Sequence, residues 1–322
     1  MQASINPNHF ELSLHKLLLL IFAISNFILC NHLAAQTTED TIADPYDRDT
    51  AYVGIMSRLL FSSHSTDTRV ATEMAFIEFM KNIEKKCSFR EFDNPDDVIT
   101  QMQEHRLDAI MANPIDYLSF EHQIDPNYHY SLIFGDRLQQ KILLLVRKSD
   151  EVENISQLSE KILAAPKGHQ LGRIFLDLNL LKNNQPLAEK HFSQINTVNS
   201  LNDAIIDLFF HHVDAALVTD VAFDLARELN PQINNQIVPL LTSKPTIQLV
   251  IGINRPVPDN FKEQINQMVE NIRQHPRTLH LLSLFKSSGV VRIDQSSLDP
   301  IREMMRDYQQ LQRTHANNNQ NN

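Results

Sequence analysis

RLDAIMANPIDYL at residues 106–118 and HVDAALVTD at residues 212–220 share one layout and decide the predicted fold. In each stretch an aspartate precedes a short apolar run typical of a buried strand, and the run passes directly into a polar helix start. A strand-like segment and a capped helix precede each copy, at 87–99 and 191–205. Repeated strand–helix–strand units predict two similar α/β lobes, each with its own largely parallel sheet.

The rest of the chain fits around this repeat. A strand at 51–56 and a helix at 68–85 precede it, and helices at 260–273 and 299–311 follow. Strand-like runs at 130–134 and 141–147 lead from one lobe to the other, and 246–253 leads back. We therefore predict an α/β protein with a double-strand hinge and an inter-lobe cleft. Lobe 1 would span 50–140 and 246–311, lobe 2 would span 141–245, and an Asn-rich disordered tail would follow at 312–322.

The first 35 residues have the parts of a secretory signal peptide. Lys16 precedes an apolar run that ends at Leu29, and Ala34 and Ala35 stand before a polar stretch. The run is shorter than the roughly 20 residues that a membrane-spanning helix needs. We expect cleavage after Ala35 and a periplasmic location, with an uncleaved membrane anchor as the alternative.

Composition narrows the class of function. A formal net charge of -10 over 322 residues argues against a nucleic-acid partner, because phosphate backbones require a basic face. There is no glycine-rich nucleotide loop and no serine elbow, so we expect neither an enzyme nor a cofactor. His211 and His212 have no matching ligand pair nearby in the sequence, and we expect no metal site. Cys87 is expected to be a small core residue.

Ligands of open α/β sheets lie beyond the carboxyl ends of the strands, where the next helices begin. Polar residues gather at four such turns, at 61–68, 112–117, 166–172 and 218–220. Free backbone N–H groups make helix starts suitable for anions, and Lys167 and His169 would add positive charge. Hydroxyl and amide side chains at these positions are also ordinary helix caps.

The order of elements and three stretches, RLDAIMANPIDYL (106–118), APKGHQLGRIF (165–175) and VDAALVTD (213–220), resemble the phosphate/phosphonate-type periplasmic binding proteins of ABC transporters. The resemblance covers about residues 50–295. It implies a type II periplasmic-binding fold and an oxyanion ligand held by hydroxyls and helix starts. By position it implies a cleft lined by Ser62, Ser63, Asn113, Tyr117, Lys167, Gly168, His169, Gln170, Thr219 and Asp220.

One loop departs from the family pattern. Family members carry serine and threonine where this chain has Lys167–Gln170. The ligand could therefore be a phosphonate, another oxyanion or a zwitterion, whose ammonium group Asp116 and Asp220 could hold.

The predicted function is capture of a small anionic or zwitterionic solute for the membrane permease of an ABC transporter. The alternative is an exported sensor or accessory protein of the same fold that signals to a membrane kinase or cyclase. A third possibility is an interaction protein with a vestigial cleft.

Overall fold

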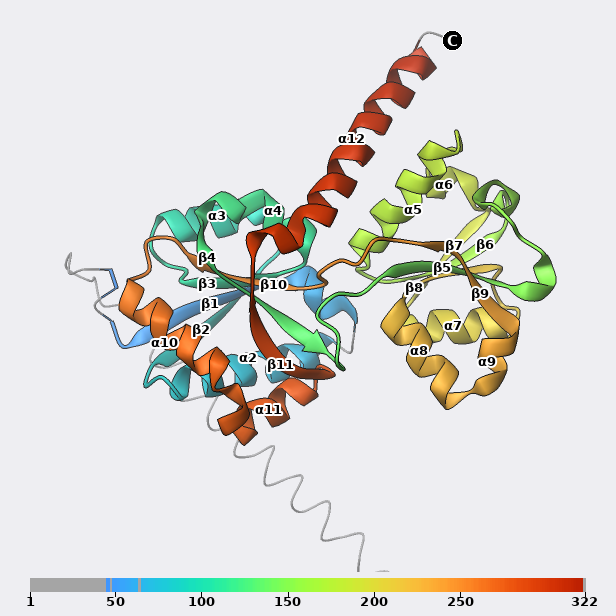
Figure 1. Cartoon of the computed structure of the whole chain (residues 1–322). Helices are drawn as coiled ribbons and strands as arrows, with labels where there is room; N and C mark the ends of the chain where they lie inside the picture. The colour runs from blue at the N-terminus through green and yellow to red at the C-terminus, as the bar shows by residue number, and fades with distance from the viewer. Residues whose placement is uncertain (1–44, 47, 63–64, 321–322) are drawn as a thin grey trace, which may run out of the picture. The chain divides into compact units, whose positions relative to one another are not determined.

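The computed structural model describes residues 45–46, 48–62 and 65–320, with the backbone alone at 60–62, 65–68 and 316–320. The predicted signal peptide, residues 1–35, lies outside this part of the chain. Arg48–Asn322 forms one compact unit that contains two sheets (Figure 1). None of the helices in the described part is long and apolar enough to span a membrane.

Lobe 1 is built on a six-stranded sheet of order β11-β4-β10-β3-β1-β2. Its strands come from the two ends of the unit: β1 (Thr50–Met56), β2 (Lys86–Phe92), β3 (Ala109–Ala112), β4 (Ile124–Phe134), β10 (Val250–Asn254) and β11 (Ser287–Ile293). Its helices are η1 (Ser57–Ser62), α2 (Ser65–Lys81), α3 (Pro95–Gln103), α4 (Pro114–Phe120), η2 (Glu121–Gln123), α10 (Asp259–Glu270), η5 (Ile272–Gln274), α11 (Pro276–Ser283), η6 (Gln295–Leu298) and α12 (Asp299–Gln320).

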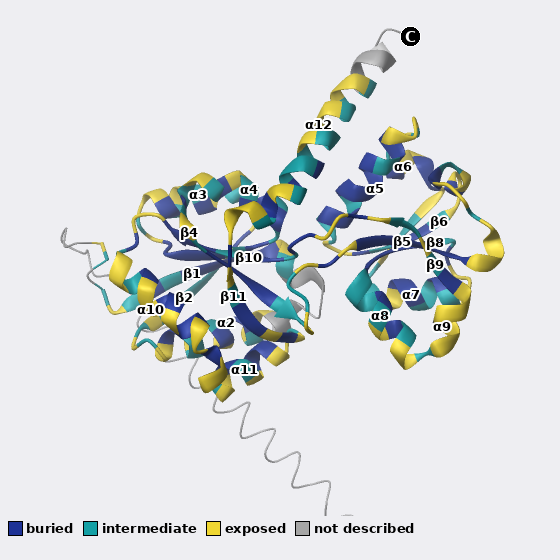
Figure 2. Ribbon diagram, in the orientation of Figure 1, coloured by how far each residue is buried: buried dark blue, intermediate teal, exposed yellow. Residues whose placement is uncertain are grey.

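Lobe 2 is built on a five-stranded sheet of order β7-β6-β8-β5-β9. The strands are β5 (Ile142–Arg147), β6 (Ile162–Pro166), β7 (Gln194–Val198), β8 (Ala215–Thr219) and β9 (Ile237–Thr242). The helices are η3 (Lys148–Asp150), η4 (Ile155–Leu158), α5 (Gln170–Lys182), α6 (Ala188–His191), α7 (Leu201–Phe209), α8 (Asp220–Leu229) and α9 (Pro231–Gln236). The central strands of both sheets are buried, and the outer faces of the helices are exposed (Figure 2).

The two sheets repeat one topology. The order β2-β1-β3-β10-β4 in lobe 1 corresponds to β7-β6-β8-β5-β9 in lobe 2, with parallel pairs among the first three strands and antiparallel pairs beyond them. The strand–helix–strand repeat read from the sequence is therefore a repeat in three dimensions. The fold class predicted from the sequence is confirmed.

The aspartates that mark the repeat have one structural role in both lobes. Asp108 accepts a hydrogen bond from the backbone N–H of Tyr52 at 2.8 Å and is paired with Arg48. Asp214 accepts one from the N–H of Ile162 at 2.9 Å and is paired with Arg147. Each carboxylate thus ties the start of one strand to a neighbouring strand, β3 to β1 in lobe 1 and β8 to β6 in lobe 2, which explains why the sequence repeats it.

Two connections join the lobes, at 135–141 and 243–249. They meet in a bridge in which the N–H of Gln140 donates to the carbonyl of Thr246 at 2.9 Å and the N–H of Thr246 donates back at 2.8 Å. This is the double-strand hinge that the sequence predicts.

Several elements differ from the sequence-based expectations. The strand expected at 191–195 begins only at Gln194, because His191 ends α6 and its side chain is buried. Strands β9 and β11 and helix α11 were not predicted. Helix α12 continues to Gln320, through most of the segment expected to be disordered. It is amphipathic and packs along α5, where Asp307 pairs with Lys182 and the His315 ring contacts the carbonyl of Leu181. The packed apolar stripe extends the helix into the Asn-rich end.

Candidate ligand-binding cleft

A cleft of about 1200 Å³ is lined by residues of both lobes. One part is polar and lies at the helix starts beyond the strand ends. The other part is apolar and runs along the lobe 1 sheet. The polar part is lined by Arg58, Asn113, Arg137, Gln140, Lys167, Gly168, His169, Gln170, Ser200, Asn202, Thr219, Asp224, Glu228 and Gln248.

The turn between β6 and α5 supplies four consecutive lining residues, Lys167–Gln170. Its first residue is anchored to the neighbouring strand by a hydrogen bond from the N–H of Lys167 to the carbonyl of Val198 at 2.9 Å. Gly168 has a φ of 76°, which glycine adopts without strain, and the chain turns there into α5. The N–H of Gln170 donates to the carbonyl of Gly168 at 2.8 Å, so the N–H groups of α5 that a ligand could meet are those of Leu171 and Gly172. Lys167 is exposed next to them.

His169 lies differently from the sequence-based expectation. Its ring packs against the backbone of the first turn of α5, where a Cβ on Gly172 would come within 2.6 Å of the imidazole. Both ring nitrogens are buried without a hydrogen-bond partner among the described residues, and burial lowers the pKa of His169 to about 4. The imidazole is therefore neutral near pH 7, and the expectation that it adds positive charge is wrong. A neutral ring still carries one N–H donor.

Asp116 is not available for a ligand ammonium group. It is buried, and its carboxylate pairs with the Arg58 guanidinium at 2.7 Å and accepts from the Asn113 side chain at 2.6 Å. Asn113 also caps α4, because its Oδ1 accepts from the N–H groups of Ile115 and Asp116. What lobe 1 presents to the cleft is the half-exposed guanidinium of Arg58, held in place from behind by a buried carboxylate.

Tyr117 is fully buried in the core and is not among the described residues that line the cleft. Its ring packs edge-on against Phe120 and His129. The side chain therefore anchors α4 to the core of lobe 1. Its pKa is raised by burial, so the hydroxyl stays protonated.

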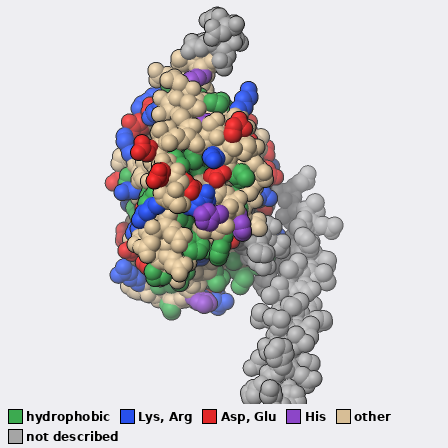
Figure 3. Space-filling model, turned by 90° about the vertical axis from the view of Figure 1, so that its right-hand side faces the viewer, with side chains coloured by type: hydrophobic (Ala, Val, Ile, Leu, Met, Phe, Trp, Pro, Cys, Tyr) green, Lys and Arg blue, Asp and Glu red, His purple; other side chains and the backbone are tan. Residues whose placement is uncertain are grey.

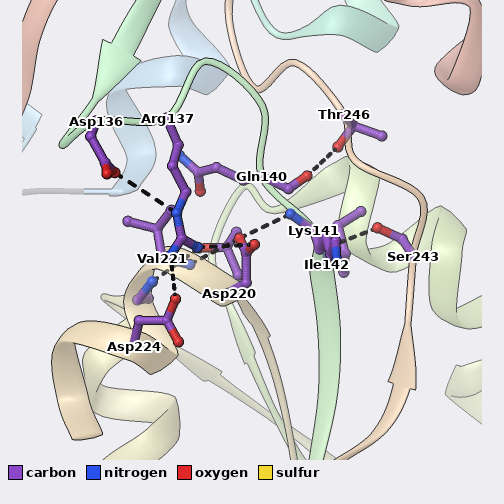
Figure 4. Close-up of polar contacts among 12 residues, drawn as sticks. Asp136, Arg137, Gln140, Lys141, Ile142, Asp220, Val221, Asp224, Ser243 and Thr246 are labelled. Atoms are coloured by element: carbon purple, nitrogen blue, oxygen red, sulfur yellow. Dashed lines mark hydrogen bonds and ion pairs between the residues drawn. The ribbon is translucent and has the colours of Figure 1, made fainter. Parts of the chain in front are cut away.

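Asp220 belongs to the hinge (Figure 4). Its Oδ1 accepts from the N–H groups of Lys141 and Val221, each at 2.9 Å, and its Oδ2 pairs with Arg137 at 3.2 Å. Arg137 also pairs with Asp224 at 2.7 Å. The arginine of one connecting segment is thus held by two carboxylates at the start of α8. Asp220, like Asp116, already has a cationic partner within the protein.

The apolar part of the cleft lies along one face of the lobe 1 sheet. Ile55 pairs with Met111, Met111 with Ile251, and Ile251 with Tyr130, so these four neighbours on β1, β3, β10 and β4 point to the same side. All four line the cleft. Opposite them lie side chains of three helices: Thr72, Ala75, Phe76, Phe79 and Met80 of α2, Ile265 and Val269 of α10, and Thr278 and Leu282 of α11.

Six residues predicted for the site line the cleft: Asn113, Lys167, Gly168, His169, Gln170 and Thr219. Asp116, Tyr117 and Asp220 are not among the described lining residues, and the side chains of Ser62 and Ser63 lie outside the described part. Sequence reasoning missed Arg58, Ser200 and Asn202. Ser200 caps α7 by accepting from the N–H of Asp203 at 3.0 Å, and its place beyond β7 could have indicated it. No sequence signal marked Arg58.

The described residues give little support for a metal site or for a nucleophilic cysteine. No group of three or more potential metal ligands occurs among them. Burial raises the pKa of Cys87 to about 12, which leaves its thiol protonated and a poor nucleophile. On the coloured part of the lobe 2 surface in Figure 3, acidic and basic side chains are interspersed rather than gathered by sign.

The family described as the periplasmic phosphonate substrate-binding protein of ABC transporters matches residues 64–298. The chain belongs to this family. Members of this phosphonate-binding family are substrate-binding components of transport systems and are not enzymes. No curated protein sequence matches the chain significantly.

Solved structures show the same fold at low sequence identity. XAC2383 from Xanthomonas citri, bound to ATP, has a TM-score of 0.58 and 14% identity, covering 82% of this chain and 98% of its own. PA3383 from Pseudomonas aeruginosa, a binding protein component of an ABC phosphonate transporter, has a TM-score of 0.57 and 13% identity, covering 83% and 88%. PhnD1 from Prochlorococcus marinus, in complex with methylphosphonate, has a TM-score of 0.55 and 15% identity, covering 82% and 98%. The shared fold is the type II periplasmic-binding fold.

Proposed function

We propose that this protein is exported, with residues 1–35 as a cleaved signal peptide, and captures a phosphonate-like oxyanion for an ABC permease. The observation that carries the proposal is the polar end of the cleft. There the start of α5, Lys167 and the Ser200 turn of lobe 2 line the same space as Arg58 of lobe 1. Backbone N–H groups at a helix start and two cationic side chains form a suitable environment for an anion.

Each lobe supplies a cationic side chain to the cleft, so a bound anion would favour closure of the two lobes. An oxyanion bound between Arg58 and Lys167 would draw the lobes together about the hinge at Gln140 and Thr246. The pairing of Asp116 and Asp220 with arginines favours a plain anion over a zwitterion at this end. The carboxylates of Asp224 and Glu228 also line the polar part, and that of Asp224 is paired with Arg137 at 2.7 Å.

The test is calorimetric titration of the mature protein with methylphosphonate, phosphate and sulfate. We expect at least one of these anions to bind, and Lys167→Ala to weaken its affinity at least about tenfold, because a hydrogen bond to a charged group contributes about 1.5–3 kcal/mol. Lys190→Ala, an exposed lysine of α6 outside the described lining, is the matched control and should bind normally. Failure of all three anions to bind would contradict the proposal.

A further inference from the structure

The cleft is much larger and more apolar than a small oxyanion requires. Its volume of about 1200 Å³ exceeds the range of about 300–1,000 Å³ common for drug-sized ligands. Its apolar lining extends from the helix starts along the lobe 1 sheet, opposite helices α2, α10 and α11.

The floor of this space is a continuous apolar surface. It consists of the in-register row Ile55, Met111 and Ile251, with Ala109 and Ile253 paired in the row two residues away. Most of these side chains are buried; Ile55 is 2% exposed and Ile253 1%. The apolar part is therefore a narrow crevice between the sheet and the helices, and a chain that enters it has to widen it.

Water is a poor occupant of such a space, because a buried water needs about two to four polar partners. Tyr130 is 1% exposed, and its hydroxyl is buried without a hydrogen-bond partner among the described residues. Thr278 already accepts a hydrogen bond from the Asn82 side chain at 3.0 Å. An apolar chain matches the remaining surface, and a polar atom near its far end could satisfy the Tyr130 hydroxyl.

The apolar space is continuous with the polar end of the cleft, where Arg58 and the Lys167 turn lie. From this continuity we infer that the ligand is an anionic amphiphile: an oxyanion head at the helix starts, with an alkyl or similarly apolar chain that enters lobe 1 between α2 and the sheet. This inference rests on the proposed function, since it takes the oxyanion site as the place of the head group.

The test compares methylphosphonate, octylphosphonate and 1-octanol by calorimetric titration of the mature protein. Each buried methylene is expected to raise affinity about fourfold, so octylphosphonate should bind at least about a hundredfold more tightly than methylphosphonate after ordering costs. 1-Octanol, which lacks the anion, should bind far more weakly than octylphosphonate.

A variant that fills the space gives the structural control. Ala75→Phe on α2 should remove the advantage of octylphosphonate and leave the affinity for methylphosphonate unchanged, because Ala75 lines the apolar part alone. Met74→Phe, on the exposed face of the same helix, should retain the advantage. If Ala75→Phe does not fold, Val269→Phe on α10 makes the same test.

The outcomes separate the two proposals. Equal affinity for methyl- and octylphosphonate would overturn the amphiphile and leave the oxyanion function standing. Binding of 1-octanol as tightly as octylphosphonate would also overturn it, since the head group would then contribute nothing. Binding of neither phosphonate, nor of phosphate or sulfate, would overturn the oxyanion function and the inference built on it.

Discussion

The two faces of the lobe 1 sheet are packed in opposite ways. On the face covered by α3 and α4, Gly54 and Gly252 let neighbouring side chains approach closely; a Cβ on Gly252 would lie 2.8 Å from Ile124 and 2.9 Å from Tyr117. On the other face, the row from Ile55 to Tyr130 lines the cleft. One sheet thus carries a close-packed core on one side and lines the cleft with the other, and the alternation of side chains along each strand separates the two.

The largest expected effect comes from adding the same side chain to each face. Gly252→Val should destabilise the protein by about 3 kcal/mol or more, because the added atoms overlap Ile124 and Tyr117. Ala109→Val, on the neighbouring strand but on the side that lines the cleft, should destabilise the protein less than Gly252→Val does. Urea unfolding of both variants without ligand measures the difference. Equal losses would show that the two faces are packed alike.

Acidification should lower the free energy of unfolding through His129, which lies on the packed face. His129 lies in register with Gly252, against the Tyr117 ring, and burial lowers its pKa below the ordinary value of 6.5. The unfolded chain then binds a proton more readily than the folded one, so this contribution to stability is complete above about pH 6.5 and declines as the pH falls through the folded pKa.

The measurement is the free energy of unfolding at pH 7 and pH 5 for the wild type and His129→Phe. We expect the variant to lose less stability on acidification than the wild type. His169 titrates in the same range in both proteins, so it cancels in the comparison. An identical pH dependence in the two proteins would exclude a role for His129.

The smallest effect is expected at the far end of the cavity. Tyr130→Phe removes a buried hydroxyl that has no partner among the described residues, and should leave the ligand-free protein unchanged or more stable by up to about 1 kcal/mol. Thermal unfolding without ligand measures it. A clear loss of stability would mean that this hydroxyl is satisfied within the protein.

Much of this fold could be predicted from local sequence. The repeated aspartates were a reliable signal because Asp108 and Asp214 both fix the start of a strand. The turn at 167–170 was predictable for the same kind of reason, since a helix start beyond a strand end is defined by neighbours in the chain.

The rest depends on partners distant in the sequence. Arg58 was missed because its role comes from Asp116, and Asp220 was misread because its partner Arg137 lies in a hinge segment distant in the sequence. The His169 imidazole can in principle carry a positive charge, but its burial against the first turn of α5 keeps it neutral. The cavity itself follows from strand register and from where α2, α10 and α11 lie, which no single stretch of sequence encodes.

The most direct test of the account is native mass spectrometry of the mature protein as isolated from cells, followed by release and identification of the bound molecule. The account predicts one anionic molecule with an apolar chain per protein. Recovery of a small polar oxyanion that lacks any apolar chain would contradict it.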